Sequence, residues 1–285
     1  MIRFLLLLVL LAAPLAYAQT SLWEVSNGRH HVIIGGSVQF LSWDDYPLPT
    51  AFDQAYAIAD KVHFQTDLGA ISKPGFGLRA MQSMTYRDGR TLRSVLSPEV
   101  WEALREFSGE RSLPSNSLIM FRPAFAVMTL SVLEGRRLGL GRGPDGYFYS
   151  RAHRTGKPVG YLESVDQQLL FLGRLNELDP DTLVTATLNE LSTMEDQSEQ
   201  VVNAWRRGDM AALDQLTGAK LRAESPELYR SLVTDRNEQW VDQIAAMLKT
   251  PDLDYVVLDA MHLSGPGNLL ELLKAQGFSV RPLVL

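Results

Sequence analysis

The 285-residue sequence contains no cysteine, which excludes disulfide bonds and a lipid anchor attached through cysteine. It also contains no block of basic residues, and its 27 Lys and Arg are outnumbered by 33 Asp and Glu. This mildly acidic balance argues against nucleic acid and anionic membrane surfaces as partners. No long apolar run follows residue 18, so we expect no stable membrane span in the mature chain. The fold must therefore depend on a hydrophobic core.

The first 18 residues contain the three parts of a secretory signal peptide. Met1–Arg3 is a short basic head, Phe4–Leu15 is almost wholly apolar, and Ala16–Ala18 supplies the small residues of a cleavage site. A membrane anchor is the alternative, but the apolar run is shorter than the ~20 residues that a spanning helix needs. We expect an exported protein of the bacterial envelope, periplasmic or extracellular, that begins at residue 19.

Short apolar runs bounded by turn signals predict buried strands. His31–Leu41 predicts a short strand that runs into a glycine turn, and Tyr255–His262 predicts another near the C-terminus. Asn27-Gly28, between two strand-like runs, is typical of a hairpin. Further strands are expected over 61–67, 159–164 and 278–283. Strands that alternate with helices predict an α/β fold with a central, mostly parallel or mixed sheet flanked by helices.

Capping residues and helical periodicity predict the helices between these strands. The expected helices cover 49–60, 91–107, a pair over 118–138 interrupted at Pro123, 147–155, 164–178, 180–192, 194–207, a long helix from Ser225 to about 248, and 268–276. Residues 164–248 are predicted to form a helical lobe that covers the sheet. We expect residues 19–285 to form one domain, because strands from both ends contribute to the same proposed site.

Ligands collect at the carboxyl ends of parallel strands, so polar residues at those positions are the first candidates for a site. Gln39 and His262 follow the two apolar strands, and Glu163 ends a third. Arg236 lies on the apolar stripe of the last long helix, with Asn237 beside it. A charged residue on such a stripe needs a partner. Arg236 either forms a structural ion pair or reaches under the strand ends.

Several short segments, in this order and spacing, resemble a known family: Leu22–Val25, Val32–Gly36, Tyr46–Leu48, Thr66–Leu68, Lys157–Val159, Leu162–Glu163, Trp205–Asp209, Asp235–Asn237 and His262–Phe278. Together they resemble the TraB/GumN (PrgY-type) family, which includes the Tiki metalloproteases, over nearly the whole mature chain. The resemblance implies a single α/β unit related to the erythromycin-esterase-like fold. It also implies a metal-dependent peptidase site made from two Gly-x-x-His motifs and a Glu. Two imidazoles and a carboxylate with an open position would activate a bound water.

This chain departs from the implied motifs at three positions. In the first motif Gly36 is kept, but Gln39 replaces the histidine. In the second motif His262 is kept, but Asp259 replaces the glycine. Gln65 stands where the resemblance implies the Glu. A glutamine side chain is neutral, is a poor substitute for imidazole and cannot act as a base near neutral pH.

These replacements favour a non-catalytic relative, a pseudoenzyme, that binds a peptide, protein or small ligand in the inherited cleft and needs no cofactor. Its cleft positions would be Gly36, Gln39, Gln65 and Asn237.

The alternative is a divergent metal-dependent hydrolase that uses His262, Asp259 and Glu163, with Arg236 as a further candidate. Its metal would be Zn, Mn or Co, and His262 would be the first ligand. A third possibility is a structural envelope protein with a vestigial cleft.

Overall fold

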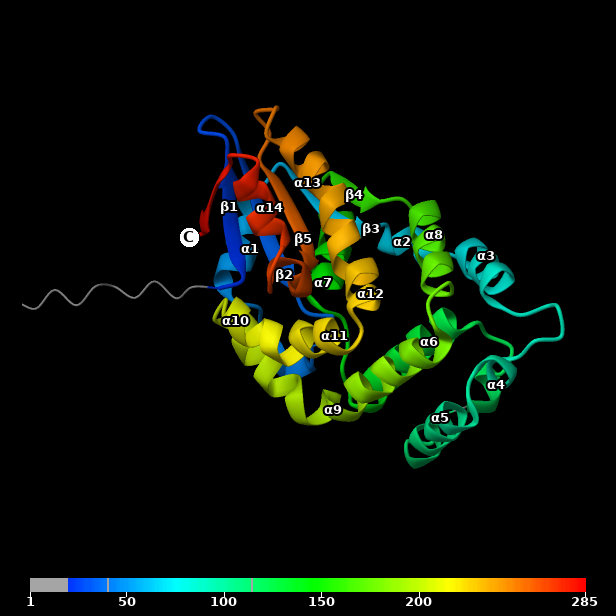
Figure 1. The fold of residues 1–285 in the computed structure, drawn as a ribbon. Coiled ribbons are helices and arrows are strands. Elements are labelled where there is room, and N and C mark those ends of the chain that lie inside the picture. The colour runs from blue at the N-terminus through cyan, green and yellow to red at the C-terminus, as the bar shows by residue number, and fades with distance from the viewer. Residues whose placement is uncertain (1–19, 40, 114) are drawn as a thin grey trace, which may run out of the picture.

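The computed structural model describes residues 20–39, 41–113 and 115–285 (Figure 1). The predicted signal peptide over residues 1–18 lies outside the described residues. The strands are β1 Leu22–Ser26, β2 His31–Ser37, β3 Lys61–Thr66, β4 Val159–Glu163, β5 Asp254–Asp259 and β6 Ser279–Pro282. The helices are α1 Thr50–Ile58, α2 Leu68–Ile71, α3 Pro74–Met84, α4 Leu92–Val95, α5 Pro98–Glu110, α6 Pro123–Arg137, α7 Pro144–Thr155, α8 Val165–Leu175, α9 Pro180–Arg206, α10 Met210–Leu213, α11 Ala219–Glu224, α12 Pro226–Tyr229, α13 Asp235–Met247 and α14 Leu269–Ala275.

The six strands form one mixed sheet in the order β4-β3-β5-β2-β1-β6. The four strands from β4 to β2 are parallel, whereas β1 is antiparallel to both β2 and β6. The predicted α/β fold is confirmed, and so is the hairpin, whose Gly28 has φ +88° in the left-handed region that suits glycine. The carboxyl ends of β2, β3, β4 and β5 therefore lie at one edge of the sheet.

Strand β2 continues through both of its glycines, so the predicted glycine turn is wrong. The strand ends at Ser37, which pairs with Asp259 of β5. A Cβ on Gly35 would lie 2.6 Å from the Tyr255 hydroxyl, and one on Gly36 would lie 3.2 Å from the Ala260 Cβ. Glycine is present here because neighbouring side chains cross the strand closely, which is a packing requirement rather than a turn signal.

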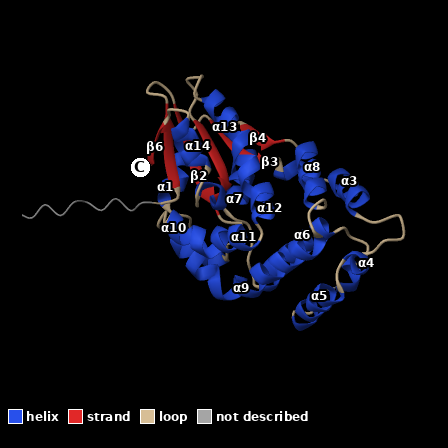
Figure 2. Ribbon diagram, viewed as in Figure 1, coloured by secondary structure: helices blue, strands red, loops and turns tan. Residues whose placement is uncertain are grey.

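Helices cover both faces of the sheet (Figures 1 and 2). Helices α1 and α7 and the end of α9 pack on one face, around Phe52, Phe148 and Trp205. Helices α13 and α14 pack on the other face, where Trp240 and Ile244 meet the apolar side chains of β2 and β5. The strands at the centre of the sheet are buried on both sides, which explains their continuous apolar runs.

A second core lies outside the sheet, in a helical lobe built from α3 to α6, α8 and the first half of α9. Its buried residues range from Met84 to Leu191, with Leu228 added from α12. The lobe thus comprises other residues than the predicted segment 164–248. It includes helices before residue 164, and the apolar side chains of α13 pack against the sheet instead. In Figure 1 the long α9 runs from this lobe to the base of the sheet.

Two helix predictions differ from the structure near proline and serine. Pro123 begins α6 rather than interrupting a helical pair, because proline suits the first position of a helix. The two helices expected over 180–207 form one 27-residue helix, α9. The hydroxyls of Ser192 and Thr193 bond to carbonyl groups of the preceding turn, so they do not end the helix.

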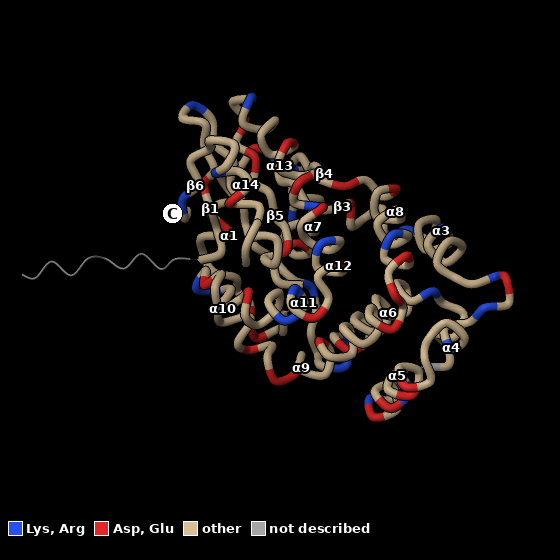
Figure 3. Tube along the Cα trace, in the orientation of Figure 1, with Lys and Arg blue, Asp and Glu red and all other residues tan. Residues whose placement is uncertain are grey.

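Charged residues of both signs are interspersed along the helices (Figure 3). Among the described residues, no helix is both long enough and apolar enough to cross a membrane.

Candidate functional site

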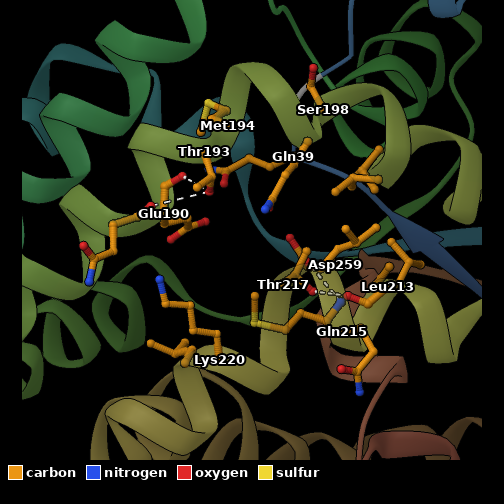
Figure 4. A pocket seen from close by; sticks show the side chains of 18 of the residues that line it. Gln39, Glu190, Thr193, Met194, Ser198, Leu213, Gln215, Thr217, Lys220 and Asp259 are labelled. Carbon is orange, nitrogen blue, oxygen red and sulfur yellow. Dashed lines mark hydrogen bonds between the residues drawn. The ribbon is translucent and has the colours of Figure 1, made fainter.

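A cavity of about 280 Å³ opens beyond the carboxyl ends of β2 and β5 (Figure 4). Val38 and Gln39, which follow β2, line it together with Asp259, Ala260 and Met261 at the end of β5. This is the edge at which open parallel sheets hold ligands. The cavity thus lies at the edge of the sheet where the sequence predicted a site.

The wall opposite the sheet is one face of α9. Its lining residues recur at helical spacing and mix polar with apolar groups: Ala186, Asn189, Glu190, Thr193, Met194, Gln197, Ser198 and Val201. Residues three or four positions apart lie on the same side of a helix, so this whole face looks into the cavity. The uninterrupted helix is what creates the wall.

The floor of the cavity comes from the segment that follows α9. A π turn over Asp214–Gly218 interrupts the helical path between α10 and α11. Gln215, Leu216 and Thr217 of this turn line the cavity, and so do Lys220 and Glu224 of α11. Single π turns inside α-helices occur frequently at functional sites.

Charged groups face one another across this space. In Figure 4, Asp259 and Gln39 lie on one side of the cavity, and Glu190 and Lys220 lie on the other. Burial raises the pKa of Asp259 to about 6; the nearby charge of Asp145 also raises it, whereas the Met261 N–H and Arg236 lower it. Burial likewise raises the pKa of Glu190, with a further rise from the charge of Asp259. By surface area the Glu190 residue as a whole is exposed, and it lines the open cavity.

Asp145 is a half-buried acidic residue that sequence reasoning missed. It lies in the first turn of α7, and its carboxylate accepts a hydrogen bond from the Ser37 hydroxyl at 3.3 Å. Burial raises its pKa. The glycine-rich segment before it is a loop, and only the fold shows that this loop brings α7 to the end of β2.

His262 lies in the short 3₁₀ turn after β5 and does not line the cavity. Its Nδ1 is 2.8 Å from the Asn237 Oδ1, and its ring packs on Trp240 with the centroids 4.5 Å apart. The side chain is 3 % exposed, and burial with the nearby charge of Arg236 lowers its pKa well below the ordinary value. His262 is therefore neutral at pH 7 and enclosed between α13 and the sheet.

Glu163 and Arg236 form a bidentate ion pair, with N–O distances of 2.8 and 3.1 Å. The guanidinium lies over the rings of Phe171 and Trp240, and Gln168 also donates to Glu163. Of the two roles considered for Arg236, the structure shows the ion pair. This pair ties α13 to the end of β4.

The remaining predicted cleft positions separate from the cavity. Gly36 is buried in β2, and its carbonyl accepts a 2.6 Å hydrogen bond from the Trp205 indole. Asn237 is fully buried beside His262, and Gln65 lies half-buried in β3 outside the lining. Of the predicted site residues, the structure brings only Gln39 and Asp259 to the cavity wall.

The three groups of the hydrolase alternative do not form a metal-binding set. Among residues 20–39, 41–113 and 115–285, no three His, Asp or Glu side chains come close enough to hold a metal ion. His262 is held by Asn237, and Glu163 is held by Arg236. A catalytic zinc site needs three protein ligands and an open position, so these residues do not fit the implied metal.

The cavity residues of α9 and α11 were also missed by sequence reasoning. The polar positions Asn189, Glu190, Thr193 and Gln197 share one helical face, and that pattern was the available signal. It was hidden because the helix was predicted to break at residue 193.

A model of the TraB/PrgY/gumN family matches residues 21–282, which is nearly the whole chain. Neither the curated proteins nor the solved structures that were searched gave a match.

Proposed function

Because the chain belongs to the TraB/PrgY/gumN family, we propose that it is an exported member that binds a small ligand in the cavity between the sheet and α9 and catalyses no metal-dependent reaction. One observation carries this proposal. The two motif positions that face the cavity hold Gln39 and Asp259, whereas the retained His262 is enclosed elsewhere. The inherited location is open, but the imidazoles that the family resemblance implies do not face it.

The chemistry of the remaining groups supports binding rather than hydrolysis. Gln39 offers a neutral amide, which can accept and donate hydrogen bonds but cannot take a proton from water near neutral pH. Glu163, the acid of the hydrolase alternative, is 5 % exposed and engaged by Arg236. No observation favours the hydrolase alternative over the binding proposal.

The open cavity also distinguishes binding from a purely structural role. A scaffold protein with a vestigial cleft should fill the space around Gln39 with side chains. Instead, Gln39 borders about 280 Å³ of space lined by both polar and apolar groups. Ligand sites typically combine apolar walls with a few polar groups and begin at about 300 Å³. The dimensions therefore suit a small ligand.

The catalytic part of the proposal is tested by metal loading. The mature chain would be incubated with Zn²⁺, Mn²⁺ or Co²⁺, desalted and analysed by mass spectrometry, with His262→Ala as the matched variant. We expect no stoichiometric metal in either protein and no cleavage of a quenched fluorescent peptide library. One metal per chain that is lost in His262→Ala, together with peptide cleavage, would overturn the proposal.

The binding part is tested by filling the cavity. Thermal-shift screening with a library of small metabolites should give stabilising compounds for the wild-type protein. Thr193→Phe places a ring in the cavity and should abolish these shifts, whereas Ser192→Phe, on an exposed position next to it, should keep them. Shifts that are the same in both variants would place binding elsewhere and contradict the proposal.

A further inference from the structure

Resting on the proposed function, we infer that the ligand is a small organic cation with an apolar tail, such as a primary amine or a guanidinium compound, held between Glu190 and Asp259. Three carboxylates line the cavity, those of Glu190, Glu224 and Asp259, and Lys220 is the one ammonium group among the described lining residues. The wall thus carries an excess of two negative charges.

None of these four groups forms an ion pair with another described residue. Glu163 and Glu134, by contrast, each form ion pairs with arginine side chains. Figure 4 shows Glu190 and Lys220 directed into the same space from neighbouring helices. Charges that a fold leaves unpaired around a cavity are available to a ligand of opposite sign.

The arrangement of the carboxylates favours an organic cation over a metal ion. They are distributed around the wall, and no three acidic or histidine side chains of the described residues gather closely enough for a metal ion. Glu190 and Asp259 nevertheless line the same cavity, and the charge of Asp259 contributes to the raised pKa of Glu190. An ammonium or guanidinium group offers several N–H donors and can reach separate acceptors.

The rest of the lining selects the tail. Apolar side chains from five parts of the chain complete the cavity, among them Val38, Leu140, Met194, Val201, Leu216 and Met261. Methionine side chains adapt to ligands of different shape. Burial of a short alkyl chain against them contributes about 0.8 kcal/mol for each CH₂ group. A fully polar cation would leave this surface unused.

The experiment compares three probes that share one tail and differ in charge: hexylammonium, 1-hexanol and hexanoate. Calorimetry with the full mature chain at pH 7.5 should show hexylammonium binding at least about tenfold more tightly than either of the others, because a hydrogen bond to a charged group is stronger than one between neutral groups. Equal binding of hexanol and hexylammonium would overturn the charge assignment. In that case, loss of hexanol binding in Thr193→Phe would still support a binding function of the cavity, and only the inference of a cationic ligand would fail.

Variants separate a direct contact from a structural effect. Glu190→Gln and Asp259→Asn should each weaken hexylammonium binding about five- to tenfold. Lys220→Met should strengthen it about two- to fivefold, because it removes a like charge from the cavity. Glu199→Gln, on the same helix but outside the lining, is the matched control and should have no effect. Weaker binding in Lys220→Met, or equal losses in Glu190→Gln and Glu199→Gln, would overturn the inference.

Discussion

Replacement of Arg236 by methionine should destabilise the protein more than any exposed charge deletion. Methionine keeps an apolar stem between Phe171 and Trp240 but leaves the carboxylate of Glu163 buried without its cation. Breaking a buried ion pair in this way costs ~3–5 kcal/mol. The Arg236 side chain is 15 % exposed and Gln168 still donates to Glu163, so we expect the lower end, about 3 kcal/mol.

The assay is urea unfolding at pH 7, followed by far-UV circular dichroism. Arg79→Met is the matched control, because the ion pair of Arg79 with Asp166 is exposed on both sides, and it should lose less than about 1 kcal/mol. The double variant Arg236→Met with Glu163→Gln should recover at least about 1 kcal/mol relative to the sum of the single losses. A loss in Arg236→Met no larger than in Arg79→Met, or strict additivity, would refute the reasoning.

Three further predictions concern pH and packing. His262 has a depressed pKa in the folded state, so the free energy of unfolding should fall as the pH drops below about 6.5, and His262→Leu should remove that slope. Asp259 has a raised pKa of about 6 in the folded state, so it contributes stability at low pH that is lost as the pH rises from 4 to 6. Asp259→Asn should therefore make the free energy of unfolding fall more steeply as the pH drops over this range. Urea unfolding at several pH values measures the His262 and Asp259 effects, and profiles identical to that of the wild-type protein would contradict both predictions. Gly35→Ala places a Cβ 2.6 Å from the Tyr255 hydroxyl and should lower the free energy of unfolding by ~1–3 kcal/mol. Gly109→Ala in α5 has open space around the new Cβ and should stabilise the protein by up to ~1 kcal/mol. Thermal unfolding that ranks the two variants in the opposite order would show that the packing around Gly35 relaxes freely.

The sequence predicted the sheet well because strand signals are local. The apolar runs of β2 and β5 and the Asn27-Gly28 turn depend on neighbouring residues, and each was recognised. The reason for glycine at positions 35 and 36, by contrast, lies outside the neighbouring sequence. Their need for glycine comes from Tyr255 and Ala260, more than 200 residues away, and periodicity carries no information about such contacts.

The candidate site was predicted only in part for the same reason. Gln39 was found because it follows a strand that ends at this edge, and Asp259 was found because it occupies a position of the implied second motif. The partners of His262 and Glu163 could not be deduced, since Asn237 and Arg236 approach them from a helix that crosses the sheet. The family resemblance supplied the location of the site, but the direction in which each side chain points depends on tertiary packing.

Helix α9 joins the two cores of the protein and also forms the cavity wall. Its 27 residues extend over about 40 Å, with Leu183 and Leu188 packed in the lobe and Trp205 packed beneath the sheet. A rigid rod fixed at both ends transmits a tilt at its middle to both anchors. A ligand that moves Glu190 should therefore alter amide hydrogen exchange in β2, where the Trp205 indole holds Gly36, as well as in the distant lobe helices. Ligand binding in the cavity would thus change the local stability of segments that do not contact the ligand.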